Sequence, residues 1–100
     1  MTGADERRRI LDRLAVALKY EPERGDSAPK VVASGRGYTA ERIIEIAKAS
    51  GVKIHEDPNL VRLLASVEIE REIPVALFAA VAEILALVYR ADEEKRRMAG

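Results

Sequence analysis

The chain contains no cysteine and only one histidine, His55, among its 100 residues. The absence of cysteine excludes disulfides, thiolate nucleophiles and zinc–thiolate sites, and a single histidine cannot supply a metal-binding histidine pair. An excess of charge of one sign is also missing, because 17 Lys and Arg residues balance 17 Asp and Glu residues. Neutralisation of phosphates supplies most non-specific affinity for nucleic acid, so we expect no nucleic-acid partner.

A long uninterrupted apolar run is absent as well. The longest run covers residues 75–89 and is broken by Glu83, whereas a helix that spans a bilayer needs about 18–20 apolar residues. The first six residues are too polar and acidic for a secretory signal peptide. We therefore expect a cytoplasmic protein that is not inserted directly into the membrane.

The residues that are present suffice for one small folded domain. Hydrophobic residues make up 48% of the chain and charged residues 34%, which excludes disordered and fibrous classes. We expect residues 14–90 to form this domain. Residues 1–13 are predicted to be a charged N-terminal arm or helix, and residues 91–100 a charged C-terminal tail.

Three short segments predict β-strands. In residues 14–20, Leu14, Val16, Leu18 and Tyr20 alternate with smaller or charged residues, a pattern typical of a strand with one core face. Residues 21–29 contain two prolines and a glycine and predict a surface loop. Residues 30–34 and 52–55 predict two further short strands.

Three segments predict helices. The first follows Thr39, a predicted N-cap, and ends at Gly51, with Ala40, Ile43, Ile44 and Ala47 as its buried stripe. Asp57 followed by Pro58 predicts the start of the second. Pro74 is expected to open the third, which runs to about Arg90 and has a broad apolar stripe: Leu77, Phe78, Val81, Ile84, Leu85 and Val88.

This order of elements predicts an α/β domain. We expect a small mixed sheet of three to four strands packed by about four helices. Residues 30–55 should form one right-handed parallel βαβ unit, since a strand, a helix and a strand follow one another there. The first strand is free to pair antiparallel.

The turn after the second predicted strand offers one candidate site. Gly35, Gly37 and Ala40 fit the spacing G-x-G-x-x-A, and Glu56 lies about where a ribose-binding acid would stand. Glycines let a backbone approach a phosphate, and a helix N-terminus favours an anion. However, the chain holds one βαβ unit, whereas a dinucleotide fold needs two larger halves. A strand-to-helix turn that requires glycine is therefore the favoured interpretation.

No metal or catalytic site is predicted. His55, Glu56 and Asp57 are consecutive, so in a strand their side chains would point to alternate sides instead of converging on one ion. No residue pairs with His55 as a nucleophile. The loop 27–29 and the rim of the last helix are small and apolar and could form a shallow hydrophobic groove, although an ordinary core edge is the favoured interpretation.

Taken together, several motifs resemble the cytoplasmic domain of the FlhB/YscU/SpaS family, the export-switch proteins of flagella and type III secretion systems. The resemblance covers residues 14–90. It is carried by residues 15–20 (Ala-Val-Ala-Leu-Lys-Tyr), 28–33 (Ala-Pro-Lys-Val-Val-Ala), 67–69 (Val-Glu-Ile), 72–74 (Glu-Ile-Pro) and 79–89, and by the Gly35-x-Gly37 turn and residues 42–47.

Two departures from the family pattern shape the expectation. Family proteins carry a transmembrane half before this domain, and we expect a stand-alone homologue that lacks it. They also carry an Asn-Pro-Thr-His loop just before the first matched strand, where the Asn side chain breaks its own peptide bond. Residues 10–13 here are Ile-Leu-Asp-Arg, so the comparison implies a domain that does not cleave itself.

The resemblance also implies a site and a function. In flagellar members a small apolar pocket is thought to receive the hydrophobic signal of early substrates, and the matching positions are Ala28, Pro29, Ala82 and Leu85. We expect a non-enzymatic binding module of the export apparatus, without a cofactor. Its expected partners are rod- or hook-type substrates and export-gate proteins such as FlhA or the membrane half of FlhB. We expect the protein in the cytoplasm or at a peripheral position on the membrane-embedded export gate. The alternative is a small nucleotide- or phosphate-binding protein that uses Gly35, Gly37 and Glu56.

Overall fold

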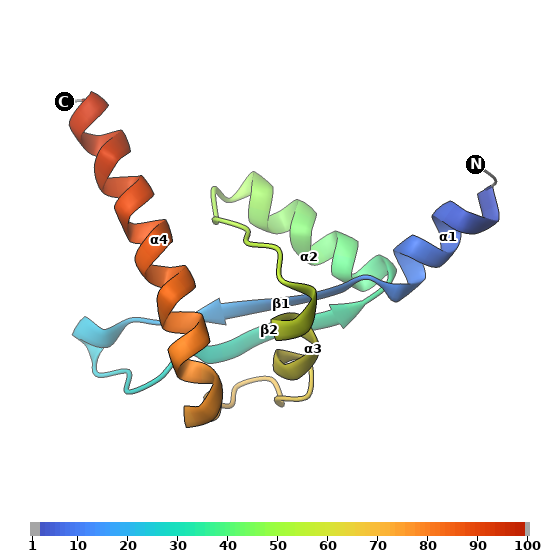
Figure 1. Cartoon of the computed structure of the whole chain (residues 1–100), viewed down its shortest axis with the longest axis horizontal. Coiled ribbons are helices and arrows are strands. Elements are labelled where there is room, and N and C mark those ends of the chain that lie inside the picture. The colour runs from blue at the N-terminus through green and yellow to red at the C-terminus, as the bar shows by residue number, and fades with distance from the viewer. Residues whose placement is uncertain (1–2, 100) are drawn as a thin grey trace.

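Seven segments of regular structure follow one another in the computed structural model, which describes residues 3–99 (Figure 1). The side chains of residues 4–6, 86–96 and 99 lie outside that description. The segments are α1 (Gly3–Asp12), β1 (Leu14–Lys19), the 3-10 turn η1 (Pro22–Arg24), β2 (Lys30–Arg36), α2 (Tyr38–Ala49), α3 (Pro58–Leu64) and α4 (Val75–Ala99). The prediction of a small α/β domain with about four helices is confirmed.

The sheet has two strands, β1 and β2, which pair antiparallel. The prediction of three to four strands with a parallel βαβ unit is therefore wrong for the described residues, in which 52–57 join α2 to α3 without regular structure. Val52 and Ile54 have the alternation of a strand, but their side chains remain 57% and 43% exposed. The local preference of residues 52–55 for an extended conformation was not sufficient to form a strand, because a strand is stabilised by side-chain packing and by pairing with another strand.

A β-bulge in β2 decides which valine enters the core. Ala17 pairs with Ala33 whereas Leu18 pairs with Val31, so Val32 is an extra residue on β2. The bulge resets the alternation of side chains, which places Val31 against the same core as Val16 and Leu18. Val31 is fully buried, while Val32 is 38% exposed.

The outer edge of β2 is partly covered by the connection between α3 and α4. The Val31 N–H donates to the Arg71 carbonyl (3.0 Å), the Glu70 N–H to the Val31 carbonyl (2.7 Å) and the Ile73 N–H to the Pro29 carbonyl (2.9 Å). Glu70 has a left-handed φ of 74° and lies in the turn just before Glu72, which forms an isolated antiparallel bridge with Lys30. This connection therefore supplies β2 with a short edge partner.

The two ends of α2 differ in how well the sequence predicted them. The predicted N-cap, Thr39, is wrong: Gly37 is the cap, with a φ of 66° that favours glycine. The predicted ending at Gly51 is confirmed. Gly51 has a φ of 74°, its N–H donates to the Lys48 carbonyl, and the Val52 N–H donates to the Ala47 carbonyl. This pair of hydrogen bonds is a Schellman motif.

The start of α3 is confirmed, because an Asp57 carboxylate oxygen accepts the Leu60 N–H at 3.0 Å and Pro58 follows the cap. The predicted end of α4 near Arg90 is wrong, since the helix continues to Ala99 (Figure 1). Residues 91–99 contain neither glycine nor proline and are rich in good helix formers, so their charge alone does not end the helix. Val88, which belongs to the predicted stripe, lies outside the described side chains.

The sheet is covered on both faces. On one face, α3 and α4 pack against the sheet around a core of five buried residues. These are Val31 of β2, Leu60 and Leu64 of α3, Ile73 of the connection before α4, and Val81 of α4. On the other face α2 packs closely on the sheet, because a Cβ added to Gly35 would collide with the Thr39 side chain and lie 3.2 Å from Ile43. Ala40 of the predicted α2 stripe is fully buried there.

Candidate functional site

The four predicted pocket residues lie on two segments that meet at one end of the sheet, here called the hairpin end (residues 20–30 and the first half of α4). Ala28 and Pro29 precede β2, and Ala82 and Leu85 lie on α4. Leu85 packs against the core cluster that contains Ile73, and Ile73 is hydrogen-bonded to the Pro29 carbonyl. Pro29 and Leu85 are thus each connected to this core cluster.

The four residues differ in how far a ligand could reach them. Pro29 is among the most completely buried side chains in the domain. Ala28, Ala82 and Leu85 are half-buried, so each keeps some surface open to solvent. Pro29 therefore contributes to packing beneath the surface in this conformation. The accessible apolar surface belongs to the other three residues.

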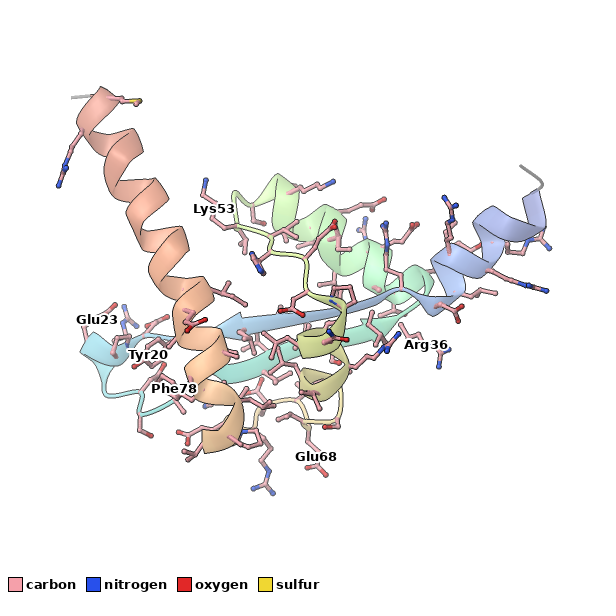
Figure 2. The ribbon with its side chains drawn as sticks, viewed as in Figure 1. Tyr20, Glu23, Arg36, Lys53, Glu68 and Phe78 are labelled. Atoms are coloured by element: carbon pink, nitrogen blue, oxygen red, sulfur yellow. The ribbon has the colours of Figure 1, made fainter. Side chains whose placement is uncertain are left out.

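Two side-chain contacts link the hairpin to its neighbours. The rings of Tyr20 and Phe78 pack edge to face, with centroids 5.7 Å apart and planes at 87°, and Figure 2 shows them together where the hairpin meets α4. The Ser27 hydroxyl donates to a Glu72 carboxylate oxygen at 3.2 Å. The sequence placed Tyr20 and Phe78 on two separate core faces, but it carried no signal that the two rings touch.

A separate hollow of about 290 Å³ lies beside the hairpin and is lined by Val32 and six charged residues: Lys19, Glu21, Arg24, Asp26, Lys30 and Glu70. Glu21 forms ion pairs with Lys19 (3.4 Å) and Arg24 (3.0 Å). None of the four predicted pocket residues lines this hollow, and its charged walls are unsuited to an apolar signal.

The glycine turn lies at the opposite end of the sheet, here called the turn end (residues 10–13 and 35–41). Gly37 is buried, and its N–H already donates to the Arg13 carbonyl at 2.8 Å. Gly35 is required by the close packing of α2, and Glu56 is exposed in the segment before α3. Both glycines thus have a structural reason, and the nucleotide alternative gains no support from this arrangement.

The positions that match the family's cleavage loop also lie at the turn end. Ile10 to Asp12 belong to α1. The Arg36 guanidinium donates to the Leu11 carbonyl and to an Asp12 carboxylate oxygen, each at 3.2 Å, and Arg13 pairs with Glu41 at 3.5 Å. Figure 2 shows Arg36 far from Tyr20 and Phe78. Residues 10–13 are therefore tied to β2 and α2 and do not form a loop.

Neither metal coordination nor membrane spanning has a structural basis in the described residues. They contain no group of three or more His, Asp or Glu side chains placed to hold a metal ion, and His55 is exposed. None of the helices, over the residues described, combines the length and the apolar character needed to cross a membrane.

The fold defines a small α/β domain of the type found at the C-terminus of secretion-system proteins. It superposes on the cytoplasmic domain of FlhB from Shewanella putrefaciens with a TM-score of 0.70 and 38% sequence identity, over 76% of this chain and 61% of that one. The PscU C-terminal domain gives a TM-score of 0.70 at 27% identity, over 76% of this chain and 96% of that one.

Sequence relatives lead to the same class. The chain is 47% identical over 81 residues to the uncharacterized protein YlqH of Bacillus subtilis, which is 81% of this chain and 86% of YlqH. It is also 47% identical over 87 residues to the flagellar biosynthetic protein FlhB of Escherichia coli, or 86% of this chain and 22% of FlhB. The chain thus spans about a fifth of the FlhB proteins that it matches.

Residues 12–88 match the profile of the FlhB HrpN YscU SpaS Family, and the chain belongs to this family. The predicted resemblance is confirmed, and with it the association with flagellar biosynthesis and type III protein export. Members of this family contain a secretion-switch module, and self-cleavage is the reaction known for the family. The family match indicates no other catalytic activity.

Proposed function

We propose that this chain is a non-enzymatic binding module of the flagellar or type III export apparatus that receives apolar export signals at Ala28, Pro29, Ala82 and Leu85. The observation that carries the proposal is the family match over residues 12–88, which includes all four positions. Its partners are rod- or hook-type substrates and export-gate proteins such as FlhA or the membrane half of FlhB. Its place is the cytoplasmic side of the gate, as the solved FlhB relative is a cytoplasmic domain.

The chemistry of the site suits a short apolar segment. Ala28, Ala82 and Leu85 are half-buried, and their side chains are apolar. Transferring an aliphatic side chain from water to such a surface is favourable by about 1.5–3 kcal/mol when burial is complete. Several such contacts along one segment would give moderate, reversible affinity, which suits a signal that must be released.

The binding proposal is tested with full-length chain immobilised against purified rod and hook proteins and export-gate cytoplasmic domains. Ala82→Glu should weaken binding at least ten-fold, about 1.4 kcal/mol, because a carboxylate would lose water beside an apolar ligand. Ala80→Glu is the matched control, since Ala80 is an exposed residue of the same helix, and should bind like wild type. Absence of binding by folded wild type at tens of micromolar would refute the proposal.

The second part of the proposal is that the chain does not cleave itself. Cleavage in the family requires an Asn side-chain amide to attack its own backbone carbonyl, yet Asn59 in α3 is the only asparagine of this sequence. Intact mass after prolonged storage should therefore remain 11.0 kDa. A discrete break between residues 10 and 14 would contradict this prediction.

A further inference from the structure

β1 has an outer edge, facing away from β2, whose backbone groups lack hydrogen-bond partners in the described residues. β1 pairs with β2 on one side only. The Gly37 N–H donates to the Arg13 carbonyl at 2.8 Å, so Arg13 faces β2, and in an antiparallel pair every second residue does so. The N–H and C=O groups of Leu14, Val16 and Leu18 therefore point away from β2. No hydrogen bond within the described part of the chain reaches these groups.

The hydrogen bonds at the far edge of β2 support this assignment. Val31 stands opposite Leu18. The Val31 N–H and C=O are bonded to the Arg71 carbonyl and the Glu70 N–H, on the side of β2 that faces away from β1. In an antiparallel pair, two opposite residues that do not bond each other both point outward, so Leu18 points away from β2. Among the described residues, β2 thus has an edge partner and β1 has none.

The sequence of β1 does not protect this edge against pairing. Natural edge strands commonly carry charged residues, prolines or bulges that prevent the addition of another strand. Residues 14–18 are Leu-Ala-Val-Ala-Leu, and the bulge of the sheet lies in β2. Leu14, Val16 and Leu18 are half-buried, so an added strand would cover apolar surface in addition to forming hydrogen bonds.

The described segments leave this edge without a covering strand. Residues 52–55 have the pattern of a strand and are exposed, but they pair with neither strand of the sheet. Figure 1 shows their connection running from α2 to α3 on the side of β1 that faces away from β2. Of the 100 residues, those not described are 1, 2 and 100, fewer than the about five or six of a typical strand. A covering strand therefore has to come from outside these 100 residues.

Charge disfavours a second copy of this chain as the source of that strand. Because β2 already has an edge partner, a second copy would offer its own β1. In the two-fold arrangement centred on Val16, all outward groups of both strands are paired, but Arg13 then lies opposite Lys19 of the second copy. These side chains are 51% and 59% exposed, and like charges directly opposite each other destabilise a strand pair. Charge complementarity favours a strand with an acidic residue at each end.

We propose that the outer edge of β1 is a docking site for an extended segment of a different protein, which adds to the sheet as a third strand. The segment is about five or more residues long, has apolar side chains opposite Leu14, Val16 and Leu18, and carries an acidic residue at each end. In strand addition, main-chain hydrogen bonds give affinity and alternate side chains give specificity. This docking site is separate from the proposed apolar site and does not depend on it.

The test is amide hydrogen exchange of isotope-labelled full-length chain with the acetylated and amidated probe peptide Glu-Val-Thr-Val-Thr-Val-Glu. Its valines match the outward residues of β1, and its glutamates match the two basic ends. Without peptide, the outward amides of Leu14, Val16 and Leu18 should exchange faster than the inward amides of Ala15 and Ala17, which face β2. Saturating peptide should slow the outward amides by about ten-fold or more and change the inward amides little.

Two N-methylated peptides are the controls, one methylated on its three valines and the other on its two threonines. N-methylation removes a hydrogen-bond donor and keeps the side chain. A strand adds to β1 through one of its own two edges, so one methylated peptide should lose binding about ten-fold or more. The other should bind like the unmodified peptide.

A pair of charge variants tests the acidic ends. Lys19→Glu should weaken binding of the peptide by up to about five-fold, because it places a like charge opposite a glutamate. Lys48→Glu, at an exposed position on α2, is the matched control and should bind like wild type. Equal binding by the two variants would refute the requirement for acidic ends.

Three results would overturn the docking site. Equal protection of the outward and inward amides without peptide, at all protein concentrations, would show that the chain itself covers the edge. Protection that rises with protein concentration, together with a dimer in sedimentation, would show that a second copy is the occupant. If the peptide leaves the outward amides unprotected, or if the two methylated peptides behave alike, strand addition is refuted.

Discussion

The two ends of the sheet are held by different kinds of interaction. At the turn end, the Gly37 N–H is hydrogen-bonded to the Arg13 carbonyl, Arg36 contacts Leu11 and Asp12, and α2 packs tightly on Gly35. At the hairpin end, ion pairs of Glu21 with Lys19 and Arg24 lie within the hairpin, and an aromatic pair, the Ser27–Glu72 hydrogen bond and apolar packing hold the surrounding segments together. The comparison teaches that a glycine motif does not by itself indicate a ligand site when close packing and backbone hydrogen bonds within the chain already explain the glycines.

The largest expected effect comes from the valine pair that the bulge separates. Val31→Ala should lower the free energy of unfolding by about 2–3 kcal/mol, because it leaves a cavity in the core next to the hairpin end. Val32→Ala, one residue along, should cost clearly less, since Val32 is 38% exposed. Urea denaturation followed by circular dichroism measures both. Equal losses for the two variants would contradict the bulged register.

A smaller effect is expected at the turn end. Gly35→Ala should destabilise the protein by about 1–3 kcal/mol, because the new methyl group would overlap the Thr39 side chain and crowd Ile43. Gly3→Ala is the control, as nothing lies within 4 Å of an added Cβ there. The same denaturation experiment compares the two. A neutral Gly35→Ala would show that α2 does not pack as closely as described.

The smallest effect concerns the tether of α1. Arg36→Gln removes contacts to Leu11 and Asp12 that are largely exposed, and exposed ion pairs contribute about 0–1 kcal/mol. Global stability should therefore change little, while amide hydrogen exchange in the last turn of α1 should become faster. Arg42→Gln, which breaks a local pair with Glu45 within α2, is the control. Unchanged exchange in α1 would show that Arg36 does not hold it.

Much of the fold was predictable because its signals are local. The Asp57-Pro58 start of α3, the glycine ending of α2 and the apolar stripe of α4 depend on residues within a few positions of one another. The failed predictions depend on partners that sequence spacing does not reveal. Residues 52–55 have a strand pattern but pair with neither strand of the sheet, and the edge partner of β2 comes from the connection between α3 and α4.

The candidate site divides in the same way. Ala28, Pro29, Ala82 and Leu85 were proposed from the sequence through family motifs, and the structure connects Pro29 and Leu85 to the core cluster. The burial of Pro29 and the contact between Tyr20 and Phe78 were not predictable. Tyr20 and Phe78 are 58 residues apart, and Pro29 and its hydrogen-bond partner Ile73 are 44 residues apart, so neither segment encodes the approach alone.

By itself, the sequence determined the domain's size, its charge balance, the end of α2, the start of α3, its family and the lack of an asparagine where the family cleaves itself. Only the tertiary structure decided that the sheet has two strands, that Val31 and not Val32 enters the core, and that the glycine turn is filled. The physical reason is that helix caps and periodic stripes are short-range properties of the chain. Strand pairing, bulges and the closing of a turn depend on which distant segment offers a hydrogen bond or an apolar surface.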